Sequence, residues 1–379
     1  MVIALGEWSL KVPVWMLLGG AFLLALWITW LSIPSIIRVA VARGLYDRPN
    51  PRSSHNRNIP TLGGMALFAG FAVAASLFAG LFVSRELLFL IAGLIILYYI
   101  GIKDDILVID PYKKLIGQLF ASMVAVVGGD IRITDMYGLF GIDHLGYVPG
   151  VLLTVLMLMV FINGYNFIDG VDGLAGGSAL LASLAFGGWF LAHGFGAYAV
   201  IAAALAGALL GFLRYNVPDG RNKIFLGDTG SLLLGLIVGV LAVRFMEYEH
   251  LLLSGRHTGT TAVLAMALLI LPLADVVRTV MRRLIRGIPL STPEKKHIHH
   301  IFINKGFSHR TTTIILLSIN ALLALFVYFL RHLNGNLLLS IFVAVVAVLL
   351  VMLSLWNRKE KKETRHVHDA GFSLSGHAH

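Results

Sequence analysis

The sequence contains no cysteine and little charge. None of its 379 residues is Cys, and Asp, Glu, Lys and Arg together make up only 13% of the chain. The absence of thiols excludes a disulfide framework and a thiolate metal site, so any metal must be bound by oxygen or imidazole. With 58% hydrophobic residues and a mean hydropathy of +0.83, the chain also lies outside the range of soluble globular domains. Lipid is therefore expected to be its main solvent.

Long apolar runs predict about eleven transmembrane helices. A helix needs about 20 apolar residues to cross a hydrocarbon core of about 30 Å, and the shorter runs would use their flanking residues. The first run is too long for the core of a signal peptide and should remain as a span. The predicted spans are residues 13–36, 63–83, 87–102, 114–129, 150–168, 174–192, 197–213, 231–246, 260–281, 312–330 and 337–356. The predicted fold is an all-α polytopic membrane protein whose single membrane domain covers residues 1–356.

Basic residues are distributed unevenly between the predicted loops. The loops on one side, together with the C-terminal tail, hold 24 of the 30 Lys and Arg residues. By the positive-inside rule this side faces the cytosol, which predicts an external N-terminus and a cytosolic C-terminus. The net charge of +10 then reflects topology and requires no nucleic-acid partner. Residues 357–379 predict a disordered cytosolic tail, and residues 130–149 predict a small external β-hairpin.

Two adjacent acids, Asp104 and Asp105, stand at the inner end of the third predicted span, close in sequence to Lys103, Lys113 and Lys114. Acids at the edge of a membrane are costly and are therefore candidates for function. Adjacent residues on a helix point about 100° apart, so the two acids are expected to have different roles. The alternative is a solvated helix end without chemistry.

A second polar group ends the fifth predicted span. Asn163, Asn166, Asp169 and Asp172 recur at every third residue and would form one slowly drifting stripe on a helix. The glycines that follow allow a tight turn and a close approach of the backbone to an anion. A glycine-rich connector without a ligand is the alternative.

Asp228 lies in a glycine-bounded turn before the eighth predicted span and is followed by Thr229 and Ser231. As a plain helix N-cap it would need no further explanation. It nevertheless adds a third oxygen-rich element to the same side of the membrane. Such a set of oxygens suits a hard cation such as Mg²⁺.

The loop after the ninth predicted span is the most basic in the chain. Asp275 can pair with Arg278, but Arg278 and Arg282 repel each other at i,i+4 unless an anion lies nearby, which favours a phosphate ligand. The loop also carries three histidines, His297, His299 and His300. Zinc binding and a solvated loop are the alternatives. No HExxH pattern accompanies these histidines, and hydrogen bonding to phosphate or sugar is equally natural.

The first loop on the same side contributes Asp47, Arg52, His55 and Arg57 ahead of a glycine pair at 63–64. This pattern is weak by itself. Its value is its position, because it lies on the side that carries the other polar groups. Arg52 and His55 are therefore added to the candidate site.

Together these segments resemble the polyprenyl-phosphate N-acetylhexosamine-1-phosphate transferases, in particular the bacterial UDP-GlcNAc:undecaprenyl-phosphate GlcNAc-1-phosphate transferases of glycosyltransferase family 4. The resemblance covers residues from about 45 to 310 and rests on KDD at 103–105, NGYNFIDGVDGLAGG at 163–177, FLGDTGSL at 225–232 and HIHH at 297–300. The peptidoglycan branch, which transfers phospho-N-acetylmuramoyl-pentapeptide, is an alternative, but it usually carries three consecutive histidines where this chain has HIHH. The family's first loop commonly reads Arg-Lys before its histidine, whereas Arg52 is followed here by two serines.

The resemblance implies an enzyme that transfers N-acetylglucosamine-1-phosphate from UDP-GlcNAc to polyprenyl phosphate, releasing UMP and starting a lipid-linked cell-envelope polysaccharide. It implies Mg²⁺ or Mn²⁺ on Asp228, to which we add Asn166 as a second ligand, and a catalytic set completed by Asp104 and Asp105. A phosphate monoester has a second pKa of about 6, so the lipid phosphate hardly needs a general base and direct attack is favoured over an aspartyl-phosphate. The predicted substrate-binding residues are Arg52, His55, Asn163, Asn166, Asp169, Asp172, Arg278, Arg282, His297, His299 and His300.

An ion-coupled transporter is the main alternative outside this class. Transport acids should lie near the middle of a span, whereas these acids lie at inner ends and in loops, and the chain shows no obvious inverted repeat. The expected location is the bacterial inner membrane, with the active site facing the cytosol. The sequence leaves open which N-acetylhexosamine is used, which polymer follows, the isoprenoid length and whether two copies form a homodimer.

Overall fold

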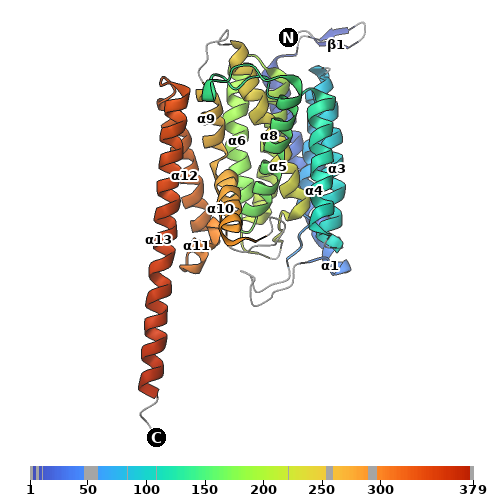
Figure 1. Cartoon of the computed structure of the whole chain (residues 1–379). Helices are drawn as coiled ribbons and strands as arrows, with labels where there is room; N and C mark the ends of the chain where they lie inside the picture. Colours follow the sequence, from blue (N-terminus) through green and yellow to red (C-terminus); the bar gives the residue numbers. More distant parts are fainter. Residues whose placement is uncertain are drawn as a thin grey trace.

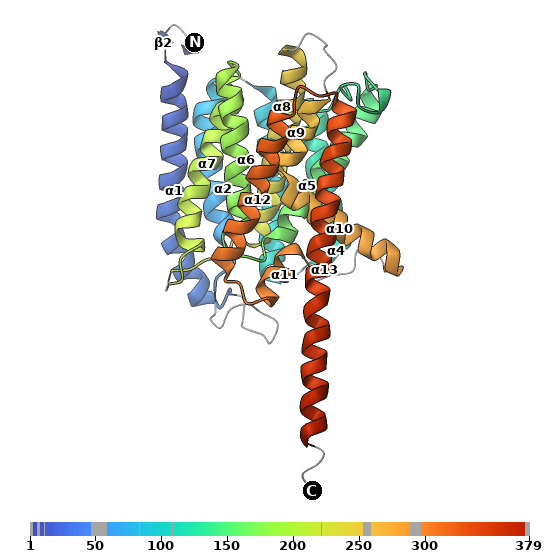
Figure 2. The same ribbon diagram turned by 90° about the vertical axis from the view of Figure 1, so that its left-hand side faces the viewer.

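The computed structural model describes residues 3–5, 8–10, 12–46, 59–82, 84–107, 109–220, 222–252, 259–288 and 297–375. These parts form a bundle of helices, with β1 at one end and the end of α13 at the other (Figures 1 and 2). The helices are α1 (Val14–Arg43), α2 (Gly63–Ala74), α3 (Arg85–Leu107), α4 (Pro111–Met123), α5 (Tyr147–Ile168), α6 (Leu174–Ala192), α7 (Gly196–Asn216), α8 (Gly227–Leu252), α9 (Thr260–Leu268), α10 (Ile270–Arg286), α11 (Ile298–Asn304), α12 (His309–Phe329) and α13 (Gly335–Ser375). The short elements are the strands β1 (Ile3–Leu5) and β2 (Trp8–Leu10), the π-helical turns η1 (Ala75–Ala79) and η3 (Val124–Gly128), and the 3₁₀ turns η2 (Gly80–Phe82) and η4 (Leu139–Gly141).

Nine helices in the described part of the chain are long and apolar enough to cross a membrane, and ten if α9 and α10 count as one bent span. A multi-pass helical membrane protein is therefore confirmed, but the predicted count of about eleven spans is not. The difference is the predicted span 114–129. It consists of α4, which is 13 residues long and has two lysines in its first turn, followed by the π turn η3.

Helix α8 is the centre of the bundle. All residues of its most apolar 18-residue stretch are buried, compared with 28% in α1 and 11% in α13. A helix that is apolar on every side belongs in a core, whereas α1 and α13 expose apolar side chains as lipid-facing helices do. Glycine lets the neighbouring helix approach α8, because a Cβ at Gly235 would lie 2.4 Å from the Cα of Ile162 in α5.

The chain bends by 85° between α9 and α10. Leu269 has φ −111° and ψ 23°, outside the helical values, and Pro272 in the first turn of α10 has no N–H to continue the helical hydrogen bonds. Figure 2 shows that the C-terminal part of α10 projects from the bundle. The first turns of α10 stay inside, so the bend keeps Asp275 buried at the end of the bundle where α11 lies.

At the far end of α8, Glu247 holds the loop between η3 and α5. Its carboxylate accepts hydrogen bonds from the Thr134 N–H at 2.9 Å, the Thr134 hydroxyl at 2.6 Å and the Tyr137 hydroxyl at 2.7 Å. The β-hairpin predicted for residues 130–149 is not confirmed. This segment contains an isolated antiparallel bridge, Asp135 to His144, and the turn η4, because left-handed backbone at positions such as Tyr137 interrupts any longer strand. The antiparallel pair β1–β2 lies instead near the N-terminus.

Helix α13 is the longest in the protein's described part, at 41 residues. Its N-terminal 22 residues form the last candidate span, and the helix then continues to Ser375. It therefore includes most of the segment 357–379 for which the sequence predicts a disordered tail. Lys, Glu and Arg are frequent there, and these residues favour helix.

Replacing Glu247 by Ala should destabilise the fold. The change leaves the Thr134 and Tyr137 donors without their acceptor, at a cost of about 1–3 kcal/mol for each buried group that water cannot reach. Thermal unfolding in detergent measures the effect. Glu249→Ala is the matched control, since one oxygen of Glu249 has no hydrogen-bond partner; equal melting temperatures for the two variants would contradict the role given to Glu247.

Candidate active site

The N-terminus of α8 is capped by a side chain from another helix. Asp105, near the end of α3, accepts hydrogen bonds from the Asp228 N–H at 2.8 Å, the Thr229 N–H at 3.0 Å and the Thr229 hydroxyl at 2.6 Å. The first N–H groups of a helix have no partner within the helix, and the helix dipole favours a negative charge there. Asp105 therefore fixes the position of Asp228, and both of its carboxylate oxygens are engaged in doing so.

Glycines allow the backbones around this helix start to meet. A Cβ at Gly101 in α3 would lie 2.3 Å from the Cα of Thr229, and a Cβ at Gly64 in α2 would lie 2.1 Å from the N of Gly230. Gly227 has φ +74°, and a Cβ there would lie 2.0 Å from the carbonyl oxygen of Thr61. The first residues of α2 also pair with the residues before α8, through the Gly63 N–H to Phe225 carbonyl bond of 2.9 Å and the Gly64 N–H to Leu226 carbonyl bond of 2.8 Å.

Lys114 bridges two carboxylates at this point. Its Nζ lies 2.8 Å from Oδ2 of Asp104 and 3.1 Å from Oδ1 of Asp228. The other oxygen of Asp104 accepts the Ile109 N–H at 2.8 Å. Asp104 thus contacts a cation while Asp105 caps a helix, so the two adjacent acids have different environments.

Lys114 is a site residue that the sequence analysis did not select. Helix α4 starts at Pro111, with Asp110 as its N-cap accepting the Tyr112 N–H at 2.9 Å. This cap, together with proline at the first helical position, sets the direction of the first turn and so of Lys114. The Asp-Pro start followed by lysine in the first turn is the sequence pattern that would have indicated it.

The predicted polar stripe of α5 divides between two neighbours. Asn166 donates hydrogen bonds to the Asp228 carboxylate and, at 3.0 Å, to the hydroxyl of Ser231. Asn163 points to α4, where it donates to Oε1 of Gln118 at 2.8 Å. Asn166 therefore belongs to the carboxylate cluster, whereas the side-chain bond of Asn163 is directed to Gln118 in α4.

Asp169 follows directly after α5 and faces the same cluster. Burial, and then the negative charges of Asp228, Asp105 and Asp172, raise the pKa of Asp169 well above its ordinary value. A carboxylate surrounded by others favours the protonated form unless a cation is near. The end of α5 and the start of α8 therefore form a region with an excess of negative charge.

The donor set fits a hard divalent cation. Lys114 contacts the carboxylates of Asp104 and Asp228, while Asp105 accepts the Asp228 N–H and Asp169 is close enough to both to feel their charges. Among the described residues, these carboxylates outnumber the amine that pairs with them, so the cluster has room for further positive charge. In the described residues, no three His, Asp or Glu side chains are arranged to hold a metal unaided. A cation would therefore complete its shell with water and substrate phosphate oxygens, as Mg²⁺ commonly does. Rotating the amide of Asn166 by 180° would place its oxygen beside Asp228 as a second ligand.

Asp172 pairs with Lys223 and with the first residue of α12, His309. Its Oδ2 lies 2.7 Å from Nζ of Lys223 and 3.2 Å from Nδ1 of His309, and its carbonyl oxygen accepts the Thr313 hydroxyl at 2.7 Å. The next residue, Gly173, has φ +76°, the left-handed region that glycine tolerates. These contacts hold the turn between α5 and α6 in place, so Asp172 has a structural role whatever else it contacts.

The HIHH segment lies against that turn. His299 is 2% exposed, and a Cβ at Gly170 would lie 2.5 Å from its Nε2. Neither ring nitrogen of His299 has a hydrogen-bond partner among the described residues. The ring centroids of His299 and His300 are 4.2 Å apart. Burial, followed by the positive charges of its neighbours, including Arg278, lowers the pKa of His299 well below its ordinary value.

The two predicted arginines of α10 occupy successive turns of that helix, and both are half-buried. Arg278 is close enough to act on the pKa of His299, whereas Arg282 lies one turn further toward the projecting end of α10 (Figure 2). Arg52 and His55 lie outside the described residues, as do Asp47 and Arg57. Their predicted roles stay predictions.

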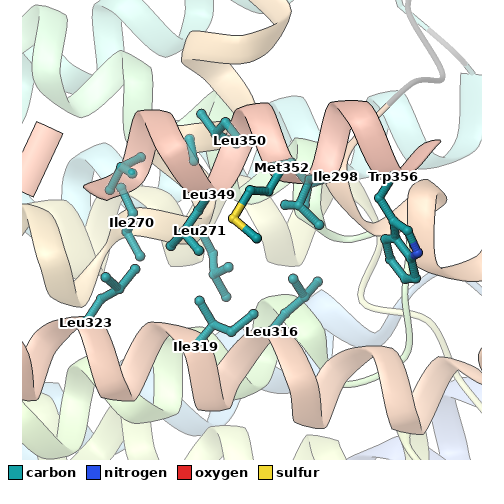
Figure 3. A pocket seen from close by; sticks show the side chains of 13 residues that line it. Ile270, Leu271, Ile298, Leu316, Ile319, Leu323, Leu349, Leu350, Met352 and Trp356 are labelled. Carbon is teal, nitrogen blue, oxygen red and sulfur yellow. The ribbon is translucent and has the colours of Figure 1, made fainter. Parts of the chain in front are cut away.

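An apolar cavity of about 360 Å³ lies between α10, α11, α12 and α13 (Figure 3). Its wall includes Ile298, which stands between two of the site histidines, and Ala274, which precedes Asp275. All the residues that line it are apolar except for the indole nitrogen of Trp356. The cavity can hold hydrocarbon but offers no group for phosphate chemistry.

The fold and this cluster define a polytopic membrane protein with a charged site at the end of its helices. The model of glycosyl transferase family 4 matches residues 87–246, which include Asp104, Asn166 and Asp228. The decaprenyl-phosphate N-acetylglucosaminephosphotransferase of Mycolicibacterium smegmatis is 32% identical over 316 residues, 76% of each chain. The undecaprenyl-phosphate alpha-N-acetylglucosaminyl 1-phosphate transferase of Escherichia coli (strain K12) is 29% identical over 290 residues, 76% of this chain and 77% of that protein.

A third relative, the "probable undecaprenyl-phosphate N-acetylglucosaminyl 1-phosphate transferase" of Bacillus subtilis (strain 168), is 28% identical over 334 residues, 88% of this chain and 90% of that protein. The chain belongs to this family of polyprenyl-phosphate N-acetylglucosaminyl 1-phosphate transferases. It is an enzyme of the phosphotransferase type, as the sequence motifs predicted, and the transporter interpretation is dropped.

Replacing Gly101 by Ala should reduce transferase activity by about 10²-fold, because a displacement of about 1 Å in a catalytic group has effects of that size. The added Cβ meets backbone atoms of Thr229, which no side-chain rotation can relieve, so α8 and Asp228 must move. Turnover by the purified protein measures the effect. Gly188→Ala in α6 is the control, since a Cβ there meets no atom within 4 Å; equal activity of both variants would contradict the packing argument.

Stability should fall on acidification because His299 is buried in its neutral form. A histidine whose pKa is lower in the folded state than its ordinary value of 6.5 binds more protons when unfolded, so stability is lost as the pH falls below 6.5. The slope is at most about 1.4 kcal/mol per pH unit for one proton. Melting temperatures of the protein and of His299→Gln between pH 7.5 and 5.5 test this, and parallel curves would refute it.

Proposed function

We propose that the protein transfers N-acetylglucosamine-1-phosphate from UDP-GlcNAc to undecaprenyl phosphate and releases UMP. The observation that carries the proposal is the carboxylate cluster with Lys114 at the N-terminus of α8. His299 lies against Gly170, which follows Asp169, and Arg278 is close enough to influence His299. A diphosphate needs cations on both sides while its bond breaks. The names of the relatives point to a polyprenyl phosphate as acceptor and to N-acetylglucosamine-1-phosphate as the group transferred.

Asp228 and Asn166 would hold Mg²⁺, with Mn²⁺ as the substitute ion. The metal would supply positive charge to the diphosphate oxygens of the donor. Asp105 keeps Asp228 in position through the N-terminus of α8, and Lys114 supplies a second positive charge within the same cluster. Asp104 orients Lys114 through their 2.8 Å contact.

Direct attack fits these contacts better than a covalent aspartyl-phosphate. An oxygen of the lipid phosphate forms a bond to the β-phosphorus of UDP-GlcNAc, and the bond from that phosphorus to the bridging oxygen breaks, so UMP leaves with that oxygen. The lipid phosphate is largely dianionic at neutral pH and needs no base. Asp105 is engaged by α8, and Asp104 by Lys114 and the Ile109 N–H, so neither carboxylate is free to act as a nucleophile without losing these bonds.

The remaining predicted contacts belong to the two substrates. Arg278, Arg282 and the three site histidines, His297, His299 and His300, would hold phosphate and sugar, with Arg52 and His55 approaching from the first loop. Asn163, Asp169 and Asp172 would shape the uridine pocket, the last of them mainly by holding the turn after α5. The site would face the cytosol of a bacterial inner membrane, where the product starts a lipid-linked glycan.

The assay for the reaction uses detergent-purified protein, undecaprenyl phosphate and radiolabelled UDP-GlcNAc, with Mg²⁺ or with a chelator. Label should enter the lipid phase only with the metal, and Asp228→Asn should lower the rate by at least about 10²-fold because it removes a metal ligand and its charge. Asp219→Asn is the matched control, since Asp219 is an exposed acid whose carboxylate pairs with Lys223.

Three outcomes would revise the proposal. Transfer from UDP-N-acetylgalactosamine instead of UDP-GlcNAc would change the donor, and transfer from UDP-N-acetylmuramoyl-pentapeptide would move the chain to the peptidoglycan branch. A labelled protein isolated after acid quenching, with GlcNAc-1-phosphate joined through its phosphorus to the carboxylate of Asp104 or Asp105, would replace direct attack by a two-step mechanism.

A further inference from the structure

The geometry points to Asp275 as a positioning residue for the reaction, acting through His297. This inference rests on the proposed function, because it concerns how one histidine of the site is presented to the substrate. Asp275 lies in the second turn of α10 and His297 directly before α11, and 22 residues separate them in the sequence. The pair was not predicted: the sequence analysis related Asp275 to Arg278.

Asp275 is almost completely buried and both of its oxygens are used. The side chain is 1% exposed. Oδ2 lies 2.6 Å from Nδ1 of His297, and Oδ1 accepts the Ile298 N–H at 2.8 Å. A buried carboxylate is costly unless its oxygens are hydrogen-bonded, so these two bonds explain why it is tolerated there. They also tie the start of α11 to α10 at two points.

The contact sets the tautomer of His297 and the direction of its ring. A carboxylate is an acceptor, so Nδ1 carries the hydrogen in this contact. The ring is held on another side by Phe167, with ring centroids 5.0 Å apart. A carboxylate that orients a histidine ring and selects its tautomer is a common device behind metal ligands and catalytic histidines.

The bend before α10 makes this contact possible. Asp275, Thr279 and Arg283 are buried and follow one another at four-residue spacing, so they form the inward face of α10. The 85° change of direction after α9 turns this face toward α11. A straight continuation of α9 would direct the same residues elsewhere, so the bend and the position of His297 are linked.

A double-mutant cycle tests the inference, with the GlcNAc-1-phosphate transfer assay as its measurement. Asp275→Asn should lower kcat by about 10–100-fold, the range seen when a partner behind a functional histidine is removed. His297→Gln should lower it at least as much. If Asp275 acts through His297, the double variant is no slower than His297→Gln by more than about twofold, since the second change removes an interaction already lost.

A merely structural role gives a different pattern. The two single effects then multiply in the double variant, and the melting temperature falls in proportion to the loss of activity; this outcome would overturn the inference. Thr279→Val is the control for burial on the same face of α10, with Thr279 1% exposed, and it should keep nearly full activity. If Asp275→Asn does not fold, Asp275→Glu, which keeps the charge and displaces it, is used in the same cycle with the same criterion.

The failure of the proposed function can be told apart from the failure of this inference. If the unaltered protein transfers no label from any of the three donors, the proposed reaction is wrong. If the unaltered protein is active and the cycle is multiplicative, the reaction stands and Asp275 has only a structural role.

Discussion

The site depends on the capped N-terminus of one buried helix. The first N–H groups of α8 lie among closely packed helices, where a donor without a hydrogen-bond partner would cost free energy. Asp105 satisfies two of them and the Thr229 hydroxyl, from a position 123 residues earlier in the chain. Because α8 is the central helix, this single carboxylate sets the position of Asp228 relative to α2, α3 and α5.

Charged groups from neighbouring helices meet at the N-terminus of α8. The amine of Lys114 neutralises part of the negative charge of Asp104 and Asp228, and the dipole of α8 favours carboxylates at its N-terminus. An excess of carboxylate remains, so a divalent cation fits. Burial, and then these negative charges, raise the pKa of Asp169. At the turn after α5, His299 of α11 lies against Gly170, the residue after Asp169, and Arg278 is close enough to influence His299. The arrangement suits a diphosphate that needs positive charge from more than one direction.

Several predictions failed for identifiable physical reasons. Asn163, Asn166, Asp169 and Asp172 were expected to form one slowly drifting stripe on a helix, but the last two residues lie beyond the end of α5. A step of three residues turns the helix back by roughly 60°, so the two residues on the helix point to different neighbours. The span at 114–129 was predicted from a run that begins with Lys114, and in the structure this lysine pairs with Asp104 and Asp228. The external hairpin was inferred from alternating residues, whereas the buried Glu247 and turns with left-handed backbone shape that loop.

The sequence by itself determined the class of the protein, because the length and polarity of apolar runs depend on composition alone, and it determined the family through four motifs in a specific order. It also selected Asp104, Asp105, Asn166, Asp228 and the histidines as members of one site, because charged groups in a lipid-solvated chain are confined to its ends and loops. Only the tertiary structure decided what each group contacts. That Asp105 caps α8, that Lys114 joins two acids and that Asp275 holds His297 are facts about helices brought together by packing, and no local pattern encodes contacts between residues that are 10, 22 or 123 positions apart.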